Sequence, residues 1–238
     1  IFSREANPEM PRTRCALLCV ELGLYNGIPE EQGMNFRIAT FILSIILICM
    51  ISFKAIKKRT TYKKLRNYLA REQYDEFFKL IDAPLTNALY PDYNINYFKL
   101  NAYLLKEDYA KANETLEMLL RYPLKHQQRV DLVLKAFNIY VGQGKKQQAK
   151  NMLDEILNWE GDEYKPYKHD ALLSYDIMIL RKSNHIGELE ALLDKTSGSQ
   201  RGRLEYFIAV QYENAKNIQK RDEYLKRAAE DGFHYSAH

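Results

Sequence analysis

The chain has 238 residues, of which 35 are Lys or Arg and 31 are Asp or Glu, for a formal net charge of +4. Four of the basic residues crowd into residues 54–59, and residues 60–238 are almost balanced, with 27 basic against 26 acidic groups. A nucleic-acid-binding domain spreads Lys and Arg over a face of its folded body, so this distribution argues against nucleic acid as a partner.

The first 33 residues stay unassigned. They begin without Met, show little sustained periodicity and end in turn-forming residues just before Met34. One hypothesis is that Met34 is the natural start and that residues 1–33 are not native. Cys15 and Cys19 lie four apart, as small apolar residues on one helix face would, and no His stands nearby to complete a metal site. No cysteine lies beyond Cys49, so residues 60–238 cannot contain a disulfide, which fits a reducing compartment.

Residues 34–59 are predicted to form a transmembrane anchor followed by a basic juxtamembrane stretch. Residues 38–53 carry no charge, and sixteen helical residues rise about 24 Å, somewhat less than the roughly 30 Å of a bilayer's hydrocarbon core. Residues 36–56 complete the span, because Arg37 and Lys54 can bury their stems and lift their charges to the headgroups. We therefore expect the chain to contact the lipid bilayer through residues 36–56.

Three alternatives to a retained span fit the apolar run less well. A cleaved signal peptide needs a small-residue cleavage site, whereas KAIKKRTTYKK follows here. A lipoprotein signal needs a small residue before its cysteine, and Ile48 precedes Cys49. A buried helix of a soluble protein needs a core wide enough to surround it. A retained span is the preferred interpretation.

The orientation of this span follows from the positive charges at its two ends, since Lys and Arg are held on the cytoplasmic side. Arg37 alone stands close before the run. The residues that follow it are Lys54, Lys57, Lys58, Arg59, Lys63, Lys64 and Arg66. The prediction is a single-pass protein of the cell membrane with a cytoplasmic C-terminal body.

Residues 60–238 are predicted to be helical throughout, because apolar residues recur at intervals of three and four and Gly or Pro stands mainly between such stretches. The clearest case is a helical hairpin in residues 133–157, with a turn at Gly142 and Gly144. Its two apolar stripes consist of Val133, Ala136, Phe137 and Tyr140, and of Ala149, Leu153 and Ile156.

This hairpin resembles the tetratricopeptide repeat (TPR), through apolar or aromatic residues at the family's spacing. The matching positions are Ala136, Phe137, Tyr140, Ala149, Leu153 and Ile156, while the proline that ends the family pattern is missing. Similar stretches begin at Tyr62, Tyr97 and Leu173 and near residue 205. The expected fold class is all-α, with a single N-terminal transmembrane helix followed by a TPR-like α-α superhelix of about five hairpins over residues 60–238. The alternative is an irregular helical domain.

No catalytic constellation is recognisable. None of the five histidines has a metal-ligand spacing, and GQGKK at residues 142–146 lacks the other positions of a phosphate loop. Carboxylate pairs such as Glu188 with Glu190 fall on solvated helix faces. The sequence therefore predicts a protein that is not an enzyme, with no cofactor and no metal.

The resemblance implies that the first helices of the repeats form a concave wall that binds peptides. The positions expected to be exposed there are Lys63 and Asn67, then Phe98 and Ala102, then Leu134 and Asn138. Lys63 and Asn67 have the spacing with which some relatives hold a C-terminal carboxylate. The next such positions hold Lys99 and Asp131 in place of Asn and Lys, so a complete clamp is not expected. Lys99 is counted with the six exposed positions as a candidate peptide-binding residue, and contact with anionic lipid is the preferred interpretation for Lys63.

The leading hypothesis for function is a membrane-tethered scaffold or adaptor whose repeats recruit a protein or peptide partner without catalysis. The alternative is an extracytoplasmic TPR-like protein that serves envelope assembly. A helical-repeat RNA-binding protein needs a basic wall, which the near-neutral body does not supply. The sequence indicates no oligomeric state.

Overall fold

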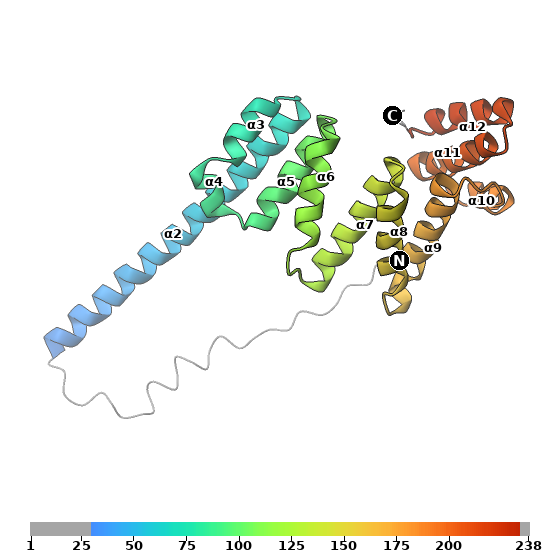
Figure 1. The fold of residues 1–238 in the computed structure, drawn as a ribbon. Helices are drawn as coiled ribbons and strands as arrows, with labels where there is room; N and C mark the ends of the chain where they lie inside the picture. Colours follow the sequence, from blue (N-terminus) through green and yellow to red (C-terminus); the bar gives the residue numbers. More distant parts are fainter. Residues whose placement is uncertain (1–29, 234–238) are drawn as a thin grey trace. The chain divides into compact units, whose positions relative to one another are not determined.

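A computed structural model describes residues 30–233 of the chain, and the expected all-α fold class is confirmed for them. They form eleven α-helices, one 3₁₀ turn and one π-helical turn, and no strand occurs among them (Figure 1). The unassigned stretch, apart from its last four positions, lies outside the described residues. The described chain divides between Tyr90 and Pro91 into two compact units. Whether residues 60–238 act as one domain stays a prediction.

The first unit is built on one long helix. Helix α2 (Glu30–Ala70) runs 41 residues without a break, and α3 (Tyr74–Ile81) and α4 (Pro84–Leu89) pack against its C-terminal part. Leu65 of α2 meets the apolar face of α3, where Phe77 and Ile81 are fully buried. None of the most apolar window of α2 is buried, and side chains such as Phe41 and Phe53 are more than 60% exposed. The apolar run is therefore not a core helix of this chain.

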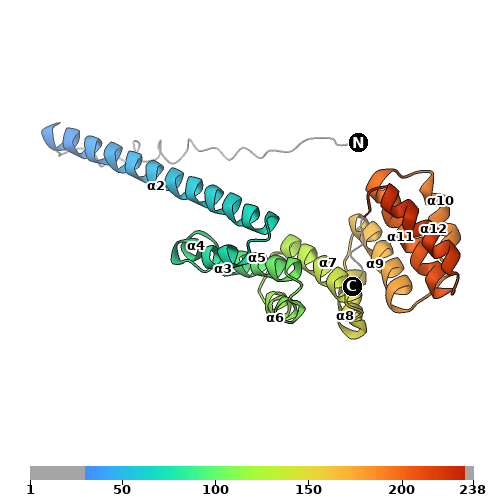
Figure 2. The same cartoon turned by 90° about the horizontal axis from the view of Figure 1, so that it is seen from above.

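The second unit consists of successive helices that pack on their neighbours (Figure 2). Its elements are α5 (Asp92–Leu105), α6 (Tyr109–Leu120), α7 (His126–Gly142), α8 (Lys146–Leu157), η1 (Asp162–Tyr164), α9 (Lys165–Ser174), η2 (Tyr175–Ile179), α10 (Ile186–Leu193), α11 (Gly198–Asn214) and α12 (Ile218–Glu230). Helices α5 and α6, α7 and α8, and α11 and α12 form antiparallel pairs, while α10 packs mainly on α11. All seven residues of the two predicted stripes in 133–157 are buried.

The same turn joins the two helices of four pairs. A residue with positive φ follows the end of the first helix. The backbone N–H of the residue after it donates to the carbonyl of a tyrosine that stands five positions before the donor. This arrangement satisfies the last carbonyls of a helix. The left-handed residues are Glu72, Glu107, Gly144 and Lys216, with φ of 56°, 59°, 65° and 61°. The accepting tyrosines are Tyr68, Tyr103, Tyr140 and Tyr212, at N···O distances of 2.9, 2.9, 2.8 and 2.8 Å.

The remaining pair departs from this pattern, because its left-handed residue comes six positions after the tyrosine instead of four. Tyr175 stands where the fifth tyrosine is expected, but residues 175–179 form a π-helical turn, in which Leu180 N donates to Tyr175 O at 3.0 Å. A π turn accommodates one extra residue within a helix. The left-handed residue is Arg181, with φ of 55°, and α10 begins only five residues later instead of two. The chain therefore reaches α10 by a longer connection.

Candidate functional site

Two of the residues predicted to bind a peptide, Lys63 and Asn67, lie on α2 in the first unit. They stand one helical turn apart and both side chains are exposed. The other five predicted residues belong to the second unit. A role for Lys63 and Asn67 in peptide binding stays a prediction.

The predicted positions on α5 are less accessible than expected. Phe98 and Lys99 are half-buried, and Ala102 is fully buried, so the expectation that Ala102 is exposed is wrong. The physical reason is visible in the spacing: Ile95, Phe98 and Ala102 follow at intervals of three and four, and this stripe of α5 is packed along its length. Ala102 cannot touch a ligand without a change in that packing.

The predicted positions on α7 line a hollow. Leu134 is half-buried and Asn138 is exposed, and both border a cavity of about 210 Å³ on the second unit. Three first helices contribute to it, namely α7, α9 and α11. The other lining residues are Phe137, Tyr167, Asp170, Ala171, Ser174 and Arg203. We call this cavity the α7–α11 hollow.

The charged groups of the α7–α11 hollow are only loosely held. Arg203 Nη1 lies 3.8 Å from Asp170 Oδ2, and the side chains are 47% and 59% exposed. The Arg203 guanidinium also lies 5.3 Å from the centre of the Phe207 ring. An exposed pair at this distance contributes little to stability, so both groups are available to a ligand.

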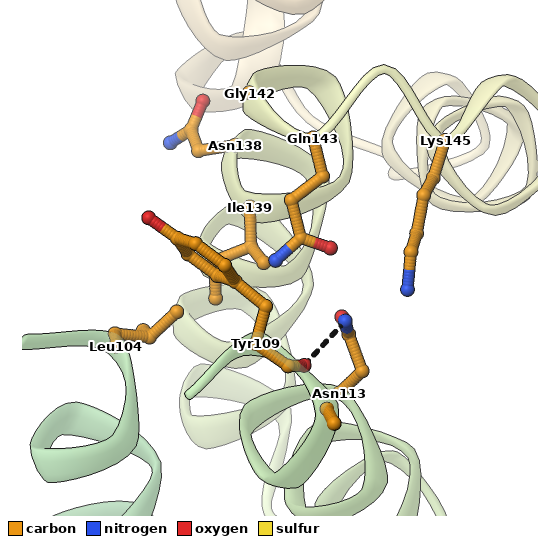
Figure 3. Close-up of a pocket in the computed structure, with 9 residues that line it drawn as sticks. Leu104, Tyr109, Asn113, Asn138, Ile139, Gly142, Gln143 and Lys145 are labelled. Atoms are coloured by element: carbon orange, nitrogen blue, oxygen red, sulfur yellow. Dashed lines mark hydrogen bonds between the residues drawn. The ribbon is translucent and has the colours of Figure 1, made fainter. Parts of the chain in front are cut away.

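A larger cavity, with a volume of about 630 Å³, opens beside the end of α7 (Figure 3). It is bordered by the end of α5, the start of α6 and the end of α7. The lining residues are Leu104, Tyr109, Ala110, Asn113, Asn138, Ile139, Gly142, Gln143 and Lys145. We call it the amide pocket. Because Asn138 borders both cavities, they are adjacent along the surface of α7.

The amide pocket contains polar atoms that meet no partner among the described residues. Asn113 Nδ2 donates to the Tyr109 carbonyl at 2.6 Å, but Asn113 Oδ1 is buried without a hydrogen bond (Figure 3). Nε2 and Oε1 of the Gln143 amide are also buried without a hydrogen bond. An unpaired buried polar group costs roughly 1–3 kcal/mol, which a ligand that pairs with it recovers.

The walls of the amide pocket determine what can enter it. Leu104, Ala110 and Ile139 offer apolar surface, and the buried donor and acceptor of the Gln143 amide can pair with a ligand once this side chain turns toward the cavity. A peptide main chain carries the complementary acceptor and donor. The Lys145 ammonium, 5.9 Å from the Tyr140 ring, adds a positive charge at the edge. This combination suits an extended segment with an apolar side chain and a nearby acidic group.

Sequence reasoning missed the residues that make the amide pocket, apart from Asn138. Two tyrosines of α5, Tyr93 and Tyr97, form a half-buried cluster with Lys135 of α7. The Lys135 ammonium lies 5.3 Å from the Tyr97 ring centre, and Tyr97 lies 5.9 Å from Tyr93. Burial lowers the pKa of Lys135 and raises those of Tyr93 and Tyr97. The rings of Tyr93 and Tyr97 therefore add apolar surface beside Lys135 of α7.

In residues 30–233 no group of three or more His, Cys, Asp or Glu side chains could hold a metal ion.

No family model matches the chain, and no curated protein matches it. A solved structure titled "MamA MSR-1 C2" is similar at 15% identity and a TM-score of 0.39, covering 74% of this chain and 97% of that one. A likeness at this level carries no argument about function.

Proposed function

We propose that this chain is a membrane-anchored, TPR-like helical-repeat adaptor, which binds an extended segment of a partner protein along α7 and performs no catalysis of its own. The observation that carries the peptide-binding proposal is the amide pocket, where three buried polar atoms of Asn113 and Gln143 lack partners beside an apolar wall. Asn138 connects this pocket to the α7–α11 hollow, so one extended segment can follow both.

The membrane anchor is supported by the length, composition and exposure of α2. One described helix is long and apolar enough to cross a membrane, with a mean hydropathy of 2.3 over its most apolar window and none of that window buried. Two of the three hydroxyls within the run are paired inside the helix, since Thr40 Oγ1 donates to Arg37 O and Ser44 Oγ donates to Thr40 O. A helix in hydrocarbon needs such internal pairing.

The TPR-like proposal rests on the regularity of the pairs. Tyrosines at 68, 103, 140, 175 and 212 recur every 35 or 37 residues at the end of each first helix. A repeat of this length is the size of a helical hairpin that must stack on neighbours to bury both its apolar stripes. Five such hairpins within residues 60–238 are the proposed repeat array.

Cytoplasmic orientation and membrane integration are tested together. The full chain in native membranes is washed with alkaline carbonate, and intact cells are treated with protease. We expect the chain to stay with the membrane and residues 60–238 to be protected until the cells are opened. Release by carbonate contradicts the anchor, and digestion in intact cells would favour the extracytoplasmic alternative.

Peptide binding is tested by photo-crosslinking in the native cell. p-Benzoylphenylalanine replaces Asn138, and as a matched control Lys226 on α12, whose side chain is 80% exposed. We expect a discrete crosslinked protein from position 138 that is absent from position 226. The same crosslink should weaken when Gln143→Leu is added, because the crosslinked segment then loses its pairing with the amide. Equal products from both positions, or no effect of Gln143→Leu, contradict the proposal.

A further inference from the structure

The first unit presents a set of positive charges that no described residue neutralises. Residues 38–71 contain no Asp or Glu. Their basic side chains on α2 are Lys54, Lys57, Lys58, Arg59, Lys63, Lys64 and Arg66, all exposed. None of them forms an ion pair with a described residue, and only Lys57 and Lys58 lie over aromatic rings, those of Phe53 and Tyr90. Unneutralised charges of one sign point to an anionic partner.

Helices α3 and α4 bring the chain back toward the apolar run. Helix α3 is antiparallel to the end of α2, and α4 lies at its returning end, beside α2 (Figure 1). Thr86 Oγ1 donates to Leu80 O at 2.7 Å and so fixes the start of α4 on the end of α3. Tyr90, which follows α4, donates its hydroxyl hydrogen to Lys58 O at 2.6 Å. The end of α4 is therefore fixed beside Lys58.

The depth of this contact follows from helix geometry. Lys58 stands five residues after Phe53, the last residue of the apolar run, which is about 7.5 Å along the helix axis. The polar headgroup layer on each side of a bilayer is about 5–8 Å thick. When the apolar run fills the hydrocarbon core, the end of α4 lies at the depth of the headgroups.

The exposed surface of α4 fits that depth. Thr86 and Leu89 are buried in the unit, whereas Leu85 is 56% exposed. Ile56 and Tyr62 of α2 are also exposed, at 64% and 46%. Apolar and aromatic side chains interspersed with Lys and Arg are the composition of a segment that lies in the membrane interface.

We propose that the first unit rests on the bilayer through α4, with Leu85 inserted among the headgroups and the basic side chains of α2 bound to anionic lipid. This inference rests on the proposed membrane anchor and adds a second, lipid-specific contact to it. The contact holds the first hairpin at a fixed orientation at the membrane surface, because a lone spanning helix is otherwise free to tilt and rotate.

The test measures the depth of Leu85 in vesicles that contain the full chain. Cys15, Cys19 and Cys49 are replaced by Ser, and an environment-sensitive fluorophore is attached after Leu85→Cys or, as a control, after Glu76→Cys on the exposed side of α3. The vesicles consist of phosphatidylcholine alone or mixed with phosphatidylserine, and carry headgroup or acyl-chain nitroxide quenchers. Carbonate-resistant flotation of the vesicles reports integration independently.

We expect headgroup nitroxides to quench the label at position 85 several-fold more than the label at 76, and more strongly when phosphatidylserine is present. The triple variant Lys57→Gln, Arg59→Gln and Lys63→Gln should remove the phosphatidylserine-dependent part. A matched variant, Lys106→Gln, Lys146→Gln and Lys226→Gln, removes three exposed charges from the second unit and should leave the quenching unchanged.

Two results overturn the inference while the anchor stands. One is a chain that floats with the vesicles but is quenched equally at 85 and 76. The other is quenching at position 85 that depends neither on phosphatidylserine nor on the three α2 charges. That result would show that the basic side chains of α2 do not bind anionic lipid. A chain that does not float with the vesicles overturns the anchor itself, and this inference with it.

Discussion

Arg129 on α7 holds Glu155 on α8 with two hydrogen bonds, from Nε to Oε1 at 2.7 Å and from Nη2 to Oε2 at 2.6 Å. Its third nitrogen, Nη1, donates to the Leu120 carbonyl at the end of α6, at 2.6 Å. One guanidinium thus connects three helices, and the hydrogen bonds to Glu155 raise the pKa of Arg129 above its ordinary value. Only arginine has the planar fork for this arrangement.

Replacing Arg129 by Lys should therefore destabilise the α6–α8 region although the charge is kept. A lysine makes one contact with Glu155 and leaves the Leu120 carbonyl without this donor. Both side chains of the pair are about a third exposed, so solvent screening limits the loss to about 1 kcal/mol for Arg129→Lys and about 2 kcal/mol for Arg129→Ala. Hydrogen exchange of the full chain, followed by mass spectrometry, measures the opening free energy of α7 and α8.

The control for this prediction is Lys150→Ala. Lys150 and Asp154 form an exposed i,i+4 pair on α8, and such pairs contribute about 0.3–0.5 kcal/mol. If Arg129→Lys is no more destabilising than Lys150→Ala, the fork geometry of Arg129 contributes nothing beyond its charge.

Gly202 of α11 should not tolerate a methyl group. A Cβ at this position would lie 2.7 Å from Phe233 Cβ and 2.8 Å from the Ala228 carbonyl oxygen, and the second of these is main chain that cannot move away cheaply. We expect Gly202→Ala to destabilise α11 and α12 by about 1–3 kcal/mol, as overpacking does, even though Ala is the better helix former. Thermal denaturation of the full chain in detergent gives the shift in Tm.

The matched control is Gly187→Ala in α10, where a Cβ meets no atom within 4 Å. Here the higher helix propensity of Ala acts alone and should stabilise the protein by up to about 1 kcal/mol. Opposite signs for the two Gly→Ala changes are the expected result, and a neutral Gly202→Ala would show that α12 moves freely away from α11.

The apolar stripes could be read from the sequence because burial follows helical periodicity. Val133, Phe137 and Leu153 are buried as the period of three and four requires. Ala102 was placed on an exposed face because a family frame assigns faces by spacing alone. In the structure its stripe, with Ile95 and Phe98, is packed. Spacing identifies which residues share a face, but only the packed neighbours decide whether that face meets solvent.

The turn signal was present in the sequence but was not recognised. Tyrosines recur every 35 or 37 residues at the ends of the first helices, yet the residues in left-handed conformation after them include Glu72, Glu107 and Lys216 in place of Gly. Gly144 is therefore the one glycine among the left-handed residues of these four turns. The π-helical turn at residues 175–179 has no glycine or proline to mark it, so its extra residue could not be predicted.

Glu205 should make stability depend on pH. Its side chain is 2% exposed, with Oε2 unpaired, and burial raises the pKa of its carboxyl although the hydrogen bond from Arg201 acts against this. An acid whose pKa is higher in the folded than in the unfolded state stabilises the fold below its unfolded pKa, near 4.3. That contribution is lost as the pH rises through the folded pKa.

Glu205→Gln should therefore raise Tm at pH 7.5 and leave it nearly unchanged near pH 4, because the amide resembles the protonated acid and its oxygen can still accept from Arg201. The control Glu213→Gln removes a carboxylate that is 49% exposed on the same helix and should change Tm little at either pH. A lower Tm for Glu205→Gln at pH 7.5 would mean that the ion pair with Arg201 outweighs the burial of the charge.

Gln143→Leu should separate stability from binding. Both polar atoms of the Gln143 amide are buried without a partner among the described residues, so an apolar side chain of similar size removes a desolvation cost and should stabilise the chain by about 1 kcal/mol. If the amide is kept for a ligand, the same change should weaken capture of the partner identified by crosslinking at position 138 by about tenfold, since one or two hydrogen bonds are lost.

The matched control is Gln147→Leu in the first turn of α8, where the side chain is exposed and donates to Asn151 Oδ1 at 3.0 Å. This change should alter neither stability nor partner binding appreciably, because solvent replaces the lost hydrogen bond. The two variants are compared by Tm and by titration of the partner onto the full chain in detergent. A Gln143→Leu protein that is destabilised shows that the amide is already satisfied. One that is more stable and binds unchanged shows that the ligand segment does not enter the amide pocket.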